Sequence, residues 1–350
     1  MTKKINKKTT SFIDLFAGIG GFHIALHDLG AECIFVNEFD RYARATYKEY
    51  FKIKNPTLFG YTDEEDSQDK IRQYFWKDIR LLTNHQETRQ KSDRLINKVI
   101  AGKLDILCAG FPCQPFSQAG HKKGFEDAKR GTLFFDIDRI LEVKKPSVVF
   151  LENVRNLANH DDGYTLGKIL QQLGTRGYDI IVPENLGGFN EKAIAKEYIR
   201  VNKGKRWNVL RASDFGAPTF RPRIYIVAFY KNKVKKNARM SFIFPAPNKN
   251  KVTLAATLGK PWPDIIGRTL RVGGRGSPHG NRHNWDSYNG TDKSILKINP
   301  GEGLKIMGFP KDFKFPVNLS PTQQMKQLGN SVAIPVIRAV ASEIIKVLHD

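Results

Sequence analysis

The stretch DLFAGIGGF, residues 14–22, decides the fold of this chain. An apolar run leads into it, a glycine-rich turn fills its middle, and residues 22–29 continue with apolar side chains at helical spacing. The glycines at 18, 20 and 21 permit a tight turn and a close approach of the backbone to a ligand. His23 stands where a dinucleotide-binding turn carries its third glycine, so this turn does not require a pyrophosphate.

Short apolar runs and segments with helical spacing alternate on the C-terminal side of this turn. We predict strands at residues 12–16, 34–37, 105–109, 147–151, 180–182 and 224–229, a third-strand end near residue 76, and helices at 22–29, 41–51 and 133–143. This alternation predicts an α/β domain with a mostly parallel sheet. In such sheets ligands bind beyond the carboxyl ends of the strands.

The character of the sequence changes after about residue 231. A basic run at 231–237 precedes Pro-, Gly- and Asn-rich sequence that continues to about residue 303. We therefore predict a first domain from residues 1–235 and 322–350 and a second, smaller, loop-rich domain from residues 236–321. The apolar stretch 332–348 has helical spacing and is expected to return to the first domain, and residues 188–206 are interpreted as a charged insertion or flap.

Composition indicates a partner of opposite charge. The 350 residues carry a formal net charge of +22, the expected footprint of a protein that binds nucleic-acid phosphates. Charge alone does not separate DNA from RNA or from an anionic membrane surface. No apolar stretch approaches the roughly 20 residues of a membrane span, and the basic residues 1–11 do not lead into a secretory signal. Three cysteines without zinc-ligand spacing indicate a reducing cytoplasm and no metal site.

Acidic residues follow two of the predicted strands. Glu38, in NEFD at 37–40, is placed to accept hydrogen bonds from ribose hydroxyls, and Asp78, in WKDI at 76–79, is placed to meet an adenine amino group. Taken alone, each acid is better interpreted as a solvated carboxylate in a loop. Their order at successive strand ends favours a nucleoside cofactor.

A cysteine in a proline-rich turn is a candidate nucleophile. Cys113 lies in AGFPCQPFS at 109–117, where prolines on both sides stiffen the loop, whereas Cys33 and Cys108 fit small core positions. Glu152, in VFLENV at 149–154, ends another strand, where a buried carboxyl with a raised pKa can donate a proton. Arg221 and Arg223 supply forked hydrogen-bond donors nearby in the sequence FRPR.

Together these segments resemble the cytosine-5 DNA methyltransferases of restriction–modification systems. The motifs run in family order: DLFAGIGGF at 14–22, NEFD at 37–40, FPCQPFS at 111–117, GTLFFD at 131–136, ENV at 152–154, RPR at 221–223, MGFP at 307–310 and GNSVAIP at 329–335. The resemblance covers nearly the whole chain outside the variable region. It implies the S-adenosylmethionine-dependent methyltransferase fold, which is Rossmann-like, with a smaller target-recognition domain.

The resemblance also implies an enzyme and a mechanism. Cys113 would attack C6 of a cytosine flipped out of duplex DNA, while Glu152 protonates or hydrogen-bonds N3 of the base. Arg223 would hold the base carbonyl, and Arg221 would position Cys113 or the sugar–phosphate. The residues implied for S-adenosylmethionine are Phe16, Gly18, Gly20, Glu38, Phe39, Asp78, Ile79, Pro112, Leu133, Asn330 and Val332.

DNA contacts are expected from two segments. Gln114 and Ser117 belong to the loop after the nucleophile, and Arg271, Arg275 and Arg282 belong to the glycine- and arginine-rich segment 268–286. Arginine favours guanine in the major groove, although a basic loop can also hold phosphates without reading sequence. Segment 268–286 is similar to those of family members that read GGNCC or GGWCC. Expected partners are double-stranded DNA and a restriction endonuclease acting on the same site, with the chain working as a monomer.

Two other functions remain open at this stage. A tRNA cytosine-5 methyltransferase would share the catalytic motifs, but the long glycine- and arginine-rich region favours DNA. A catalytically inactive DNA-binding module is opposed by the presence of both Cys113 and Glu152. The chain departs from the family pattern at Thr219, where glutamine is usual, and at Gly301, where arginine is usual.

Overall fold

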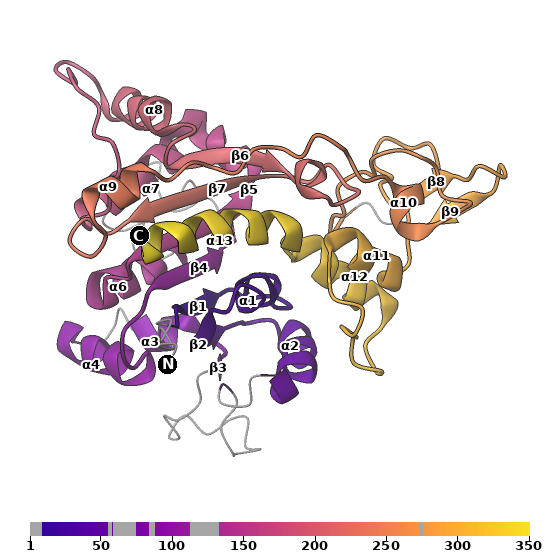
Figure 1. The fold of residues 1–350 in the computed structure, drawn as a ribbon, viewed down its shortest axis with the longest axis horizontal. Helices are drawn as coiled ribbons and strands as arrows, with labels where there is room; N and C mark the ends of the chain where they lie inside the picture. Colours follow the sequence, from indigo (N-terminus) through magenta and orange to yellow (C-terminus); the bar gives the residue numbers. More distant parts are fainter. Residues whose placement is uncertain (1–8, 55–57, 59–74, 84–87, 113–132, 274–275) are drawn as a thin grey trace, which may run out of the picture.

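The computed structural model describes residues 9–54, 58, 75–83, 88–112, 133–273 and 276–350. In this part of the chain seven strands form one sheet in the order β3-β2-β1-β4-β5-β7-β6 (Figure 1). Their bounds are β1 Ser11–Leu15, β2 Glu32–Asn37, β3 Phe75–Trp76, β4 Ile106–Gly110, β5 Val148–Val154, β6 Trp207–Arg211 and β7 Pro222–Phe229. The glycine turn connects β1, near the middle of this sheet, to helix α1 (Gly21–His27).

Most neighbouring strands run parallel. The parallel pairs are β1 with β2, β1 with β4, β2 with β3 and β4 with β5, whereas β7 is antiparallel to both β5 and β6. The predicted α/β fold with a mostly parallel sheet is therefore confirmed. The carboxyl ends of five strands, β1 to β5, consequently meet along one edge of the sheet.

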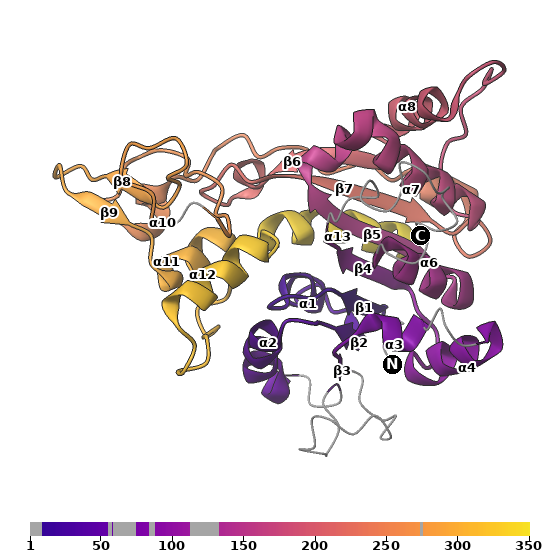
Figure 2. The same cartoon turned by 180° about the vertical axis from the view of Figure 1, so that it is seen from behind.

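Helices cover both faces of the sheet with their apolar sides. Helices α1, α2 (Arg41–Lys54) and α13 (Ile334–His349) share one hydrophobic cluster with the sheet, and α3 (Ile79–Thr83), α4 (Arg89–Val99), α6 (Leu133–Lys144) and α7 (Tyr164–Thr175) share the other. Figures 1 and 2 show α13 crossing one face and α6 and α7 on the opposite face. Adjacent residues Phe12 and Ile13 fall in different clusters, as the alternation of a strand requires. Among the helices in the described ranges, none is both long and apolar enough to cross a membrane.

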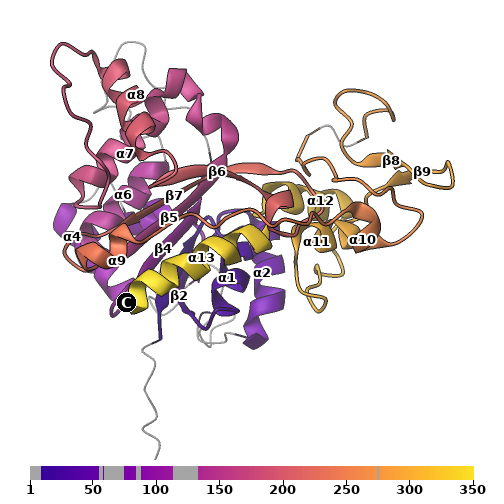
Figure 3. The same ribbon diagram turned by 45° about the horizontal axis from the view of Figure 1, so that its top comes forward.

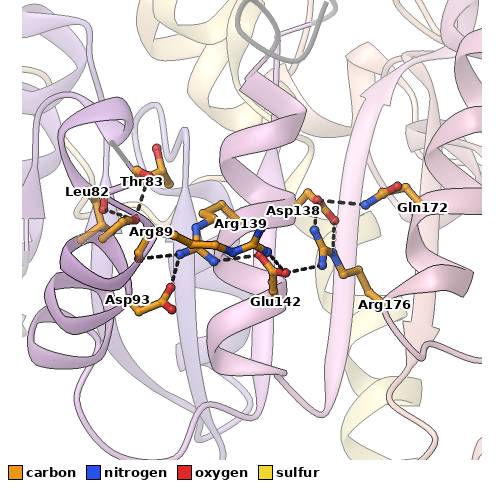
Figure 4. Close-up of polar contacts among 10 residues, drawn as sticks. Leu82, Thr83, Arg89, Asp93, Asp138, Arg139, Glu142, Gln172 and Arg176 are labelled. Carbon is orange, nitrogen blue, oxygen red and sulfur yellow. Dashed lines mark hydrogen bonds and ion pairs between the residues drawn. The ribbon is translucent and has the colours of Figure 1, made fainter. Parts of the chain in front are cut away.

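Charged side chains join α6 to its two neighbours (Figure 4). Arg139 of α6 pairs with Asp93 of α4 and donates to Glu142 at 2.8 Å. Asp138, on the same helix, accepts two hydrogen bonds from Arg176 at 2.7 and 2.6 Å. Because Asp138 and Arg139 are mostly buried, these pairs hold α6 in a fixed place between α4 and α7.

A loop-rich region lies beyond one end of the sheet (Figure 3). It contains α10 (Leu254–Leu258), the hairpin of β8 (Ser287–Asn289) and β9 (Ile295–Lys297), α11 (Pro300–Met307) and α12 (Pro321–Asn330), whereas α9 (Lys236–Met240) lies beside the sheet. Asn299 and Glu302 form a capping box at the start of α11, so Gly301 does not prevent this helix from beginning. The apolar cluster around α1 and α13 continues into the region through Leu254 and Leu270.

One predicted strand was wrong, and one strand was missed. Residues 180–182 do not form a strand, because the side chain of Asn202 donates to the carbonyl of Ile181 and accepts from its N–H, which replaces pairing with a neighbouring strand. Strand β6 was not predicted, because its burial does not follow a clear alternation. The segment 188–206, interpreted as a flap, holds helix α8 (Glu191–Asn202), which Asn190 caps by accepting from Ala193 N–H.

The contact between α7 and α8 gives a direct test of this packing. A Cβ placed on Gly167 would lie 2.5 Å from both the Cβ and the carbonyl oxygen of Ala195, which is fully buried. We predict that Gly167→Ala lowers the free energy of unfolding by about 1–3 kcal/mol, because overpacking outweighs the better helix propensity of alanine. Urea denaturation monitored by circular dichroism measures this.

Gly187→Ala is the matched control. No atom lies within 4 Å of the Cβ position at Gly187, so this change should stay within about 0.5 kcal/mol of the wild type. Equal stabilities of the two variants would contradict the close approach of α7 and α8.

Candidate active site

A cavity of about 690 Å³ lies at the carboxyl ends of the parallel strands. Its walls come from the turn after β1, the ends of β2, β4 and β5, and the last turn of α12. Most of the predicted site residues in the described part of the chain line it together: Phe16, Gly18, Glu38, Phe39, Asp78, Ile79, Pro112, Leu133, Glu152, Arg221, Arg223 and Asn330. The sheet topology thus brings together groups that are as far as 314 positions apart in sequence, from Phe16 to Asn330.

Two predicted cofactor residues do not line the cavity. Gly20 has a positive φ of 87°, and a Cβ there would lie 2.3 Å from the ring of Phe51. Val332 packs against Gly21, whose Cβ position lies 2.5 Å from a Val332 methyl carbon. Both residues therefore shape the glycine turn from behind its ligand-facing side.

Other predicted residues fall outside the cavity or outside the described structure. Cys113, Gln114, Ser117 and Arg275 lie outside the described residues. Arg271 and Arg282 are exposed in the region beyond the sheet, where both bond to His283. Pro112, the last described residue before Cys113, is part of the cavity wall.

Glu38 ties together the loops that follow β1 and β2. One carboxylate oxygen accepts from Gly18 N–H at 2.7 Å, and the other accepts from Asp40 N–H at the same distance. Only 9% of Glu38 is exposed, so burial raises the pKa of its carboxyl, while these backbone donors oppose the shift. Each oxygen keeps a further lone pair for a ligand hydroxyl.

Two buried amides at the cavity have unsatisfied atoms. The side chain of Asn37 donates to the carbonyls of Trp76 and Lys77, and its Oδ1 has no hydrogen-bond partner. Gln327 accepts from the Thr46 hydroxyl at 2.8 Å, and its Nε2 has no partner. Since buried polar groups are normally satisfied, an acceptor and a donor at this wall indicate a polar ligand. Sequence reasoning missed both, although Asn37 begins the NEFD motif and Gln327 lies two residues before the GNSVAIP motif.

A carboxylate and a guanidinium face each other at the end of β5. Arg223 Nε lies 3.1 Å from Glu152 Oε1, and Glu152 is 7% exposed. Burial raises the pKa of Glu152, and the charges of Arg223 and Arg221 oppose this shift. The β4–β5 register places Glu152 opposite Gly110, which begins the turn toward Cys113.

Asn153 fixes the backbone of that turn. Its buried side-chain amide donates to the Phe111 carbonyl at 2.8 Å, while its own oxygen accepts from Val154 N–H. The chain therefore leaves β4 in a defined direction just before Pro112. The motif ENV predicted the glutamate of this site but not the role of the asparagine beside it.

His23 supports the glycine turn from the sheet side. Its Nδ1 is hydrogen-bonded to the Tyr47 hydroxyl at 2.5 Å, and its ring stacks on Phe51 with centroids 3.9 Å apart. Burial lowers the pKa of His23 to about 3, so the ring is neutral inside the protein. The residue that replaces a third glycine thus anchors α1 to α2.

The cavity wall combines buried polar groups with an aromatic ring. Buried carboxylate and amide groups line it beside the exposed ring of Phe39 and a tight glycine turn. Across the described ranges, no group of three or more His, Cys, Asp or Glu side chains is arranged to hold a metal.

Comparison with protein families decides the assignment. The model of the family described as C-5 cytosine-specific DNA methylase matches residues 10–272 and 265–346. The chain belongs to this family. The predicted family and the predicted enzyme class, a DNA cytosine-5 methyltransferase, are thereby confirmed.

Individual methylases agree with this membership. The chain is 35% identical to the Type II methyltransferase M.SsoII of Shigella sonnei, over 97% of this chain and 80% of that protein. It is 34% identical to M.NlaX of Neisseria lactamica, with 95% of each chain covered. A putative DNA modification methyltransferase from an Escherichia coli prophage has the same fold, with a TM-score of 0.60, 18% identity and coverage of 98% and 100%.

The buried imidazole of this methylase predicts sensitivity to acid. Unfolded histidine has a pKa of about 6.5, so below that pH the unfolded state binds a proton that folded His23 takes up only near pH 3. His23 should therefore lower the free energy of unfolding by up to about 1.4 kcal/mol per pH unit as the pH falls below 6.5. We expect His23→Gln to show a shallower decrease between pH 6.5 and 5 in urea denaturation.

His27→Gln is the control for this measurement. His27 is exposed on the same helix, and its replacement leaves the buried ring in place. The His27 variant should keep the wild-type acid dependence. A His23 variant with the wild-type dependence would show that the buried imidazole is not its source.

Proposed function

We propose that this enzyme transfers a methyl group from S-adenosylmethionine to C5 of a cytosine within a short duplex DNA sequence. The observation that carries the proposal is the buried pair of Glu152 and Arg223 beside the turn that leads to Cys113. In this role the chain is the modification enzyme of a restriction–modification system. It works as a monomer in the cytoplasm, and a restriction endonuclease acts on the same site.

The cavity residues would hold the cofactor in a defined orientation. Glu38 would accept from the ribose hydroxyls and Asp78 from the adenine amino group, while Phe16 and Phe39 flank the ligand. Asp78 now pairs with Arg80, with 2.7 Å between Oδ2 and the guanidinium, and would exchange part of this contact on binding. The further cofactor contacts proposed are Gly18, Ile79, Pro112, Leu133 and Asn330, whereas Gly20 and Val332 would act on the cofactor through the glycine turn that they shape. When bound, S-adenosylmethionine supplies an electrophilic methyl group.

Cytosine C5 needs activation, and the proposed catalytic residues provide it. The Cys113 thiolate forms a bond to C6, and the ring electrons move toward C5 and N3. Glu152, whose pKa is raised by burial against the opposing charges of Arg223 and Arg221, would protonate or hydrogen-bond N3 as negative charge develops. Arg223 holds the base carbonyl and Arg221 orients the site. C5 would then take the methyl group, with the sulfur of the cofactor keeping the electron pair of the broken bond. N3 would return its proton to Glu152, a base would remove the C5 proton, and the Cys113 thiolate would leave C6, which restores the ring.

DNA recognition is assigned to the region beyond the sheet. We propose residues 236–321 as the target-recognition domain, whose first helix, α9, lies beside the sheet, with Arg271, Arg275 and Arg282 reading bases or holding phosphates. Gln114 and Ser117 would contact the DNA around the cytosine, which must leave the stack to reach the cavity. Arg268 is not proposed as a DNA contact, because its guanidinium donates to the carbonyls of Asn284 and Ser287 within this region.

A DNA substrate is favoured over RNA by the relatives. M.SsoII and M.NlaX are named Type II methyltransferases and are similar to this chain over nearly its whole length. The net charge of +22 suits either nucleic acid. The first experiment therefore includes both substrates.

The test is base-resolution mapping of 5-methylcytosine on plasmid DNA incubated with the purified protein and S-adenosylmethionine, with tRNA in parallel. We expect methylation at one short DNA motif. Methylated tRNA with unmodified DNA would move the substrate to RNA. Modification of neither would favour a binding module without activity.

The nucleophile assignment has its own test. Cys113→Ala should lower methyl transfer by at least about 1,000-fold, because it removes the thiolate proposed to form the bond to C6, while DNA binding in a gel-shift assay persists. Cys33→Ala is the matched control, since Cys33 is buried in the apolar cluster around α1 and should leave transfer near the wild-type rate. Substantial turnover by the Cys113 variant would assign the nucleophile elsewhere.

A further inference from the structure

Arg221 is buried in a way that separates it from the other arginine of the RPR motif. It is 2% exposed and has a positive φ of 25°, a strained conformation for a residue with a side chain. Arg223 points to Glu152, whereas the guanidinium of Arg221 donates to three backbone carbonyls. These are the carbonyls of Leu270, at 2.9 Å, of Gly329, at 3.0 Å, and of Ser331.

The three carbonyls belong to two segments with different expected tasks. Leu270 immediately precedes Arg271, which is proposed to contact DNA. Gly329 and Ser331 flank Asn330, which lines the cavity. The residues at 329 and 331 also stand at the C-terminal end of α12, where the helix dipole favours a positive charge.

The two segments also touch each other directly. A Cβ on Gly329 would lie 2.7 Å from the carbonyl carbon of Arg271 and 2.8 Å from the amide nitrogen of Val272. Only glycine permits this approach of two backbones. A shift of either segment would therefore displace the other.

The chain just before Arg221 runs alongside the recognition segment. Thr219 donates from its hydroxyl to the Arg268 carbonyl at 2.8 Å, and Phe220 N–H donates to the Gly267 carbonyl at 3.0 Å. Thr219 is one of the two positions at which the chain departs from the family pattern, and its hydroxyl, on a fully buried residue, satisfies a backbone acceptor there. We call residues 219–221, 267–272 and 329–331 the Arg221 junction.

The rigid guanidinium of Arg221 links the position of the Leu270 backbone to that of the Gly329 and Ser331 backbone. Its donors lie in a fixed plane, so the carbonyls of both segments must be in register for all three bonds to form. The group is desolvated, and its Nε has no hydrogen-bond partner, so losing one carbonyl would leave a second donor of a buried charge unsatisfied. Burial lowers the pKa of Arg221 to about 9, which leaves the group charged at neutral pH.

We propose that Arg221 is a positioning residue that couples DNA recognition to the cofactor cavity. DNA held by the segment around Arg271 fixes the Leu270 carbonyl, and Arg221 then fixes Gly329 and Ser331, and with them Asn330 in the cavity wall. Coupling between two binding sites is reciprocal, so a ligand in the cavity also strengthens DNA binding. This inference rests on the proposed function, because it takes DNA and S-adenosylmethionine as the two ligands.

The test measures the dissociation constant of S-adenosylhomocysteine with and without a saturating duplex that contains the mapped motif. The full-length protein is used, and the ratio of the two constants is the coupling factor. We expect the wild type to bind S-adenosylhomocysteine about tenfold more tightly with the duplex. Arg221→Lys keeps the charge but loses the planar fork, so its coupling factor should fall to within about twofold of one.

Arg268→Lys is the matched control. Arg268 also donates to backbone carbonyls, but its partners Asn284 and Ser287 both lie in the region beyond the sheet. This variant should bind the duplex more weakly and retain the wild-type coupling factor once the duplex saturates it. Equal loss of coupling in the Arg221 and Arg268 variants would overturn the proposal. A general loosening of the protein would then explain the loss in each variant.

Hydrogen exchange on the wild type keeps the proposal testable if Arg221→Lys does not fold. The duplex alone should slow amide exchange at residues 329–332, and S-adenosylhomocysteine alone should slow it at residues 268–272. Unchanged exchange in both segments would overturn the coupling. If the wild type methylates DNA but has a coupling factor of one, the coupling proposal is overturned and the proposed function stands. If no substrate is methylated, both the coupling proposal and the proposed function are overturned.

Discussion

Burial of the central sheet on both faces dictates where this molecule can place polar groups. Helices α1 and α13 cover one face, and α4, α6 and α7 cover the other, so the interior of β4 and of most of β5 is apolar. Polar side chains therefore lie mainly where the strands end, because the helices do not cover the sheet there. Asp14 is an exception inside β1, and burial raises the pKa of its carboxyl well above the usual range. The cavity is thus a direct result of covering the sheet.

The groups that end the strands also hold the backbone in place. Glu38 accepts N–H groups from the loops after β1 and β2, and Asn153 donates to the turn after β4. The same carboxylate or amide that would meet a ligand therefore keeps its own loop in position. A site built in this way is preorganised, because its hydrogen-bonding groups are already fixed before a ligand arrives.

Local sequence patterns predicted the parts of this structure that local physics determines. The glycine turn, most of the buried strands and the acids at their ends are visible in short windows, because each follows from hydrophobic periodicity or a backbone requirement. The strand predicted at 180–182 failed because the side chain of Asn202, 21 positions from Ile181, satisfies the backbone of Ile181. Cofactor contacts at Gly20 and Val332 came from the family pattern, which does not reveal that they pack behind the cavity wall.

The contacts of Arg221 were beyond the reach of sequence for a related reason. Its three carbonyl partners lie 49, 108 and 110 positions away, and backbone acceptors leave no residue-type signal. The unsatisfied amides of Asn37 and Gln327 likewise emerge only when the walls are assembled. Cys113, the residue most plainly marked by its sequence, lies outside the described structure.

The apolar cluster that runs from the sheet into the loop-rich region limits how freely that region can be exchanged. Leu254, Leu270 and Trp285 belong to the same cluster as Phe12 of β1 and Val340 of α13. A foreign recognition segment grafted into this chain would have to bring matching apolar side chains at its base, whatever bases its loops read. Chimeras could instead place their crossover points inside the exposed loops, outside that shared core. Such chimeras would keep the core packing of this chain and change only its surface.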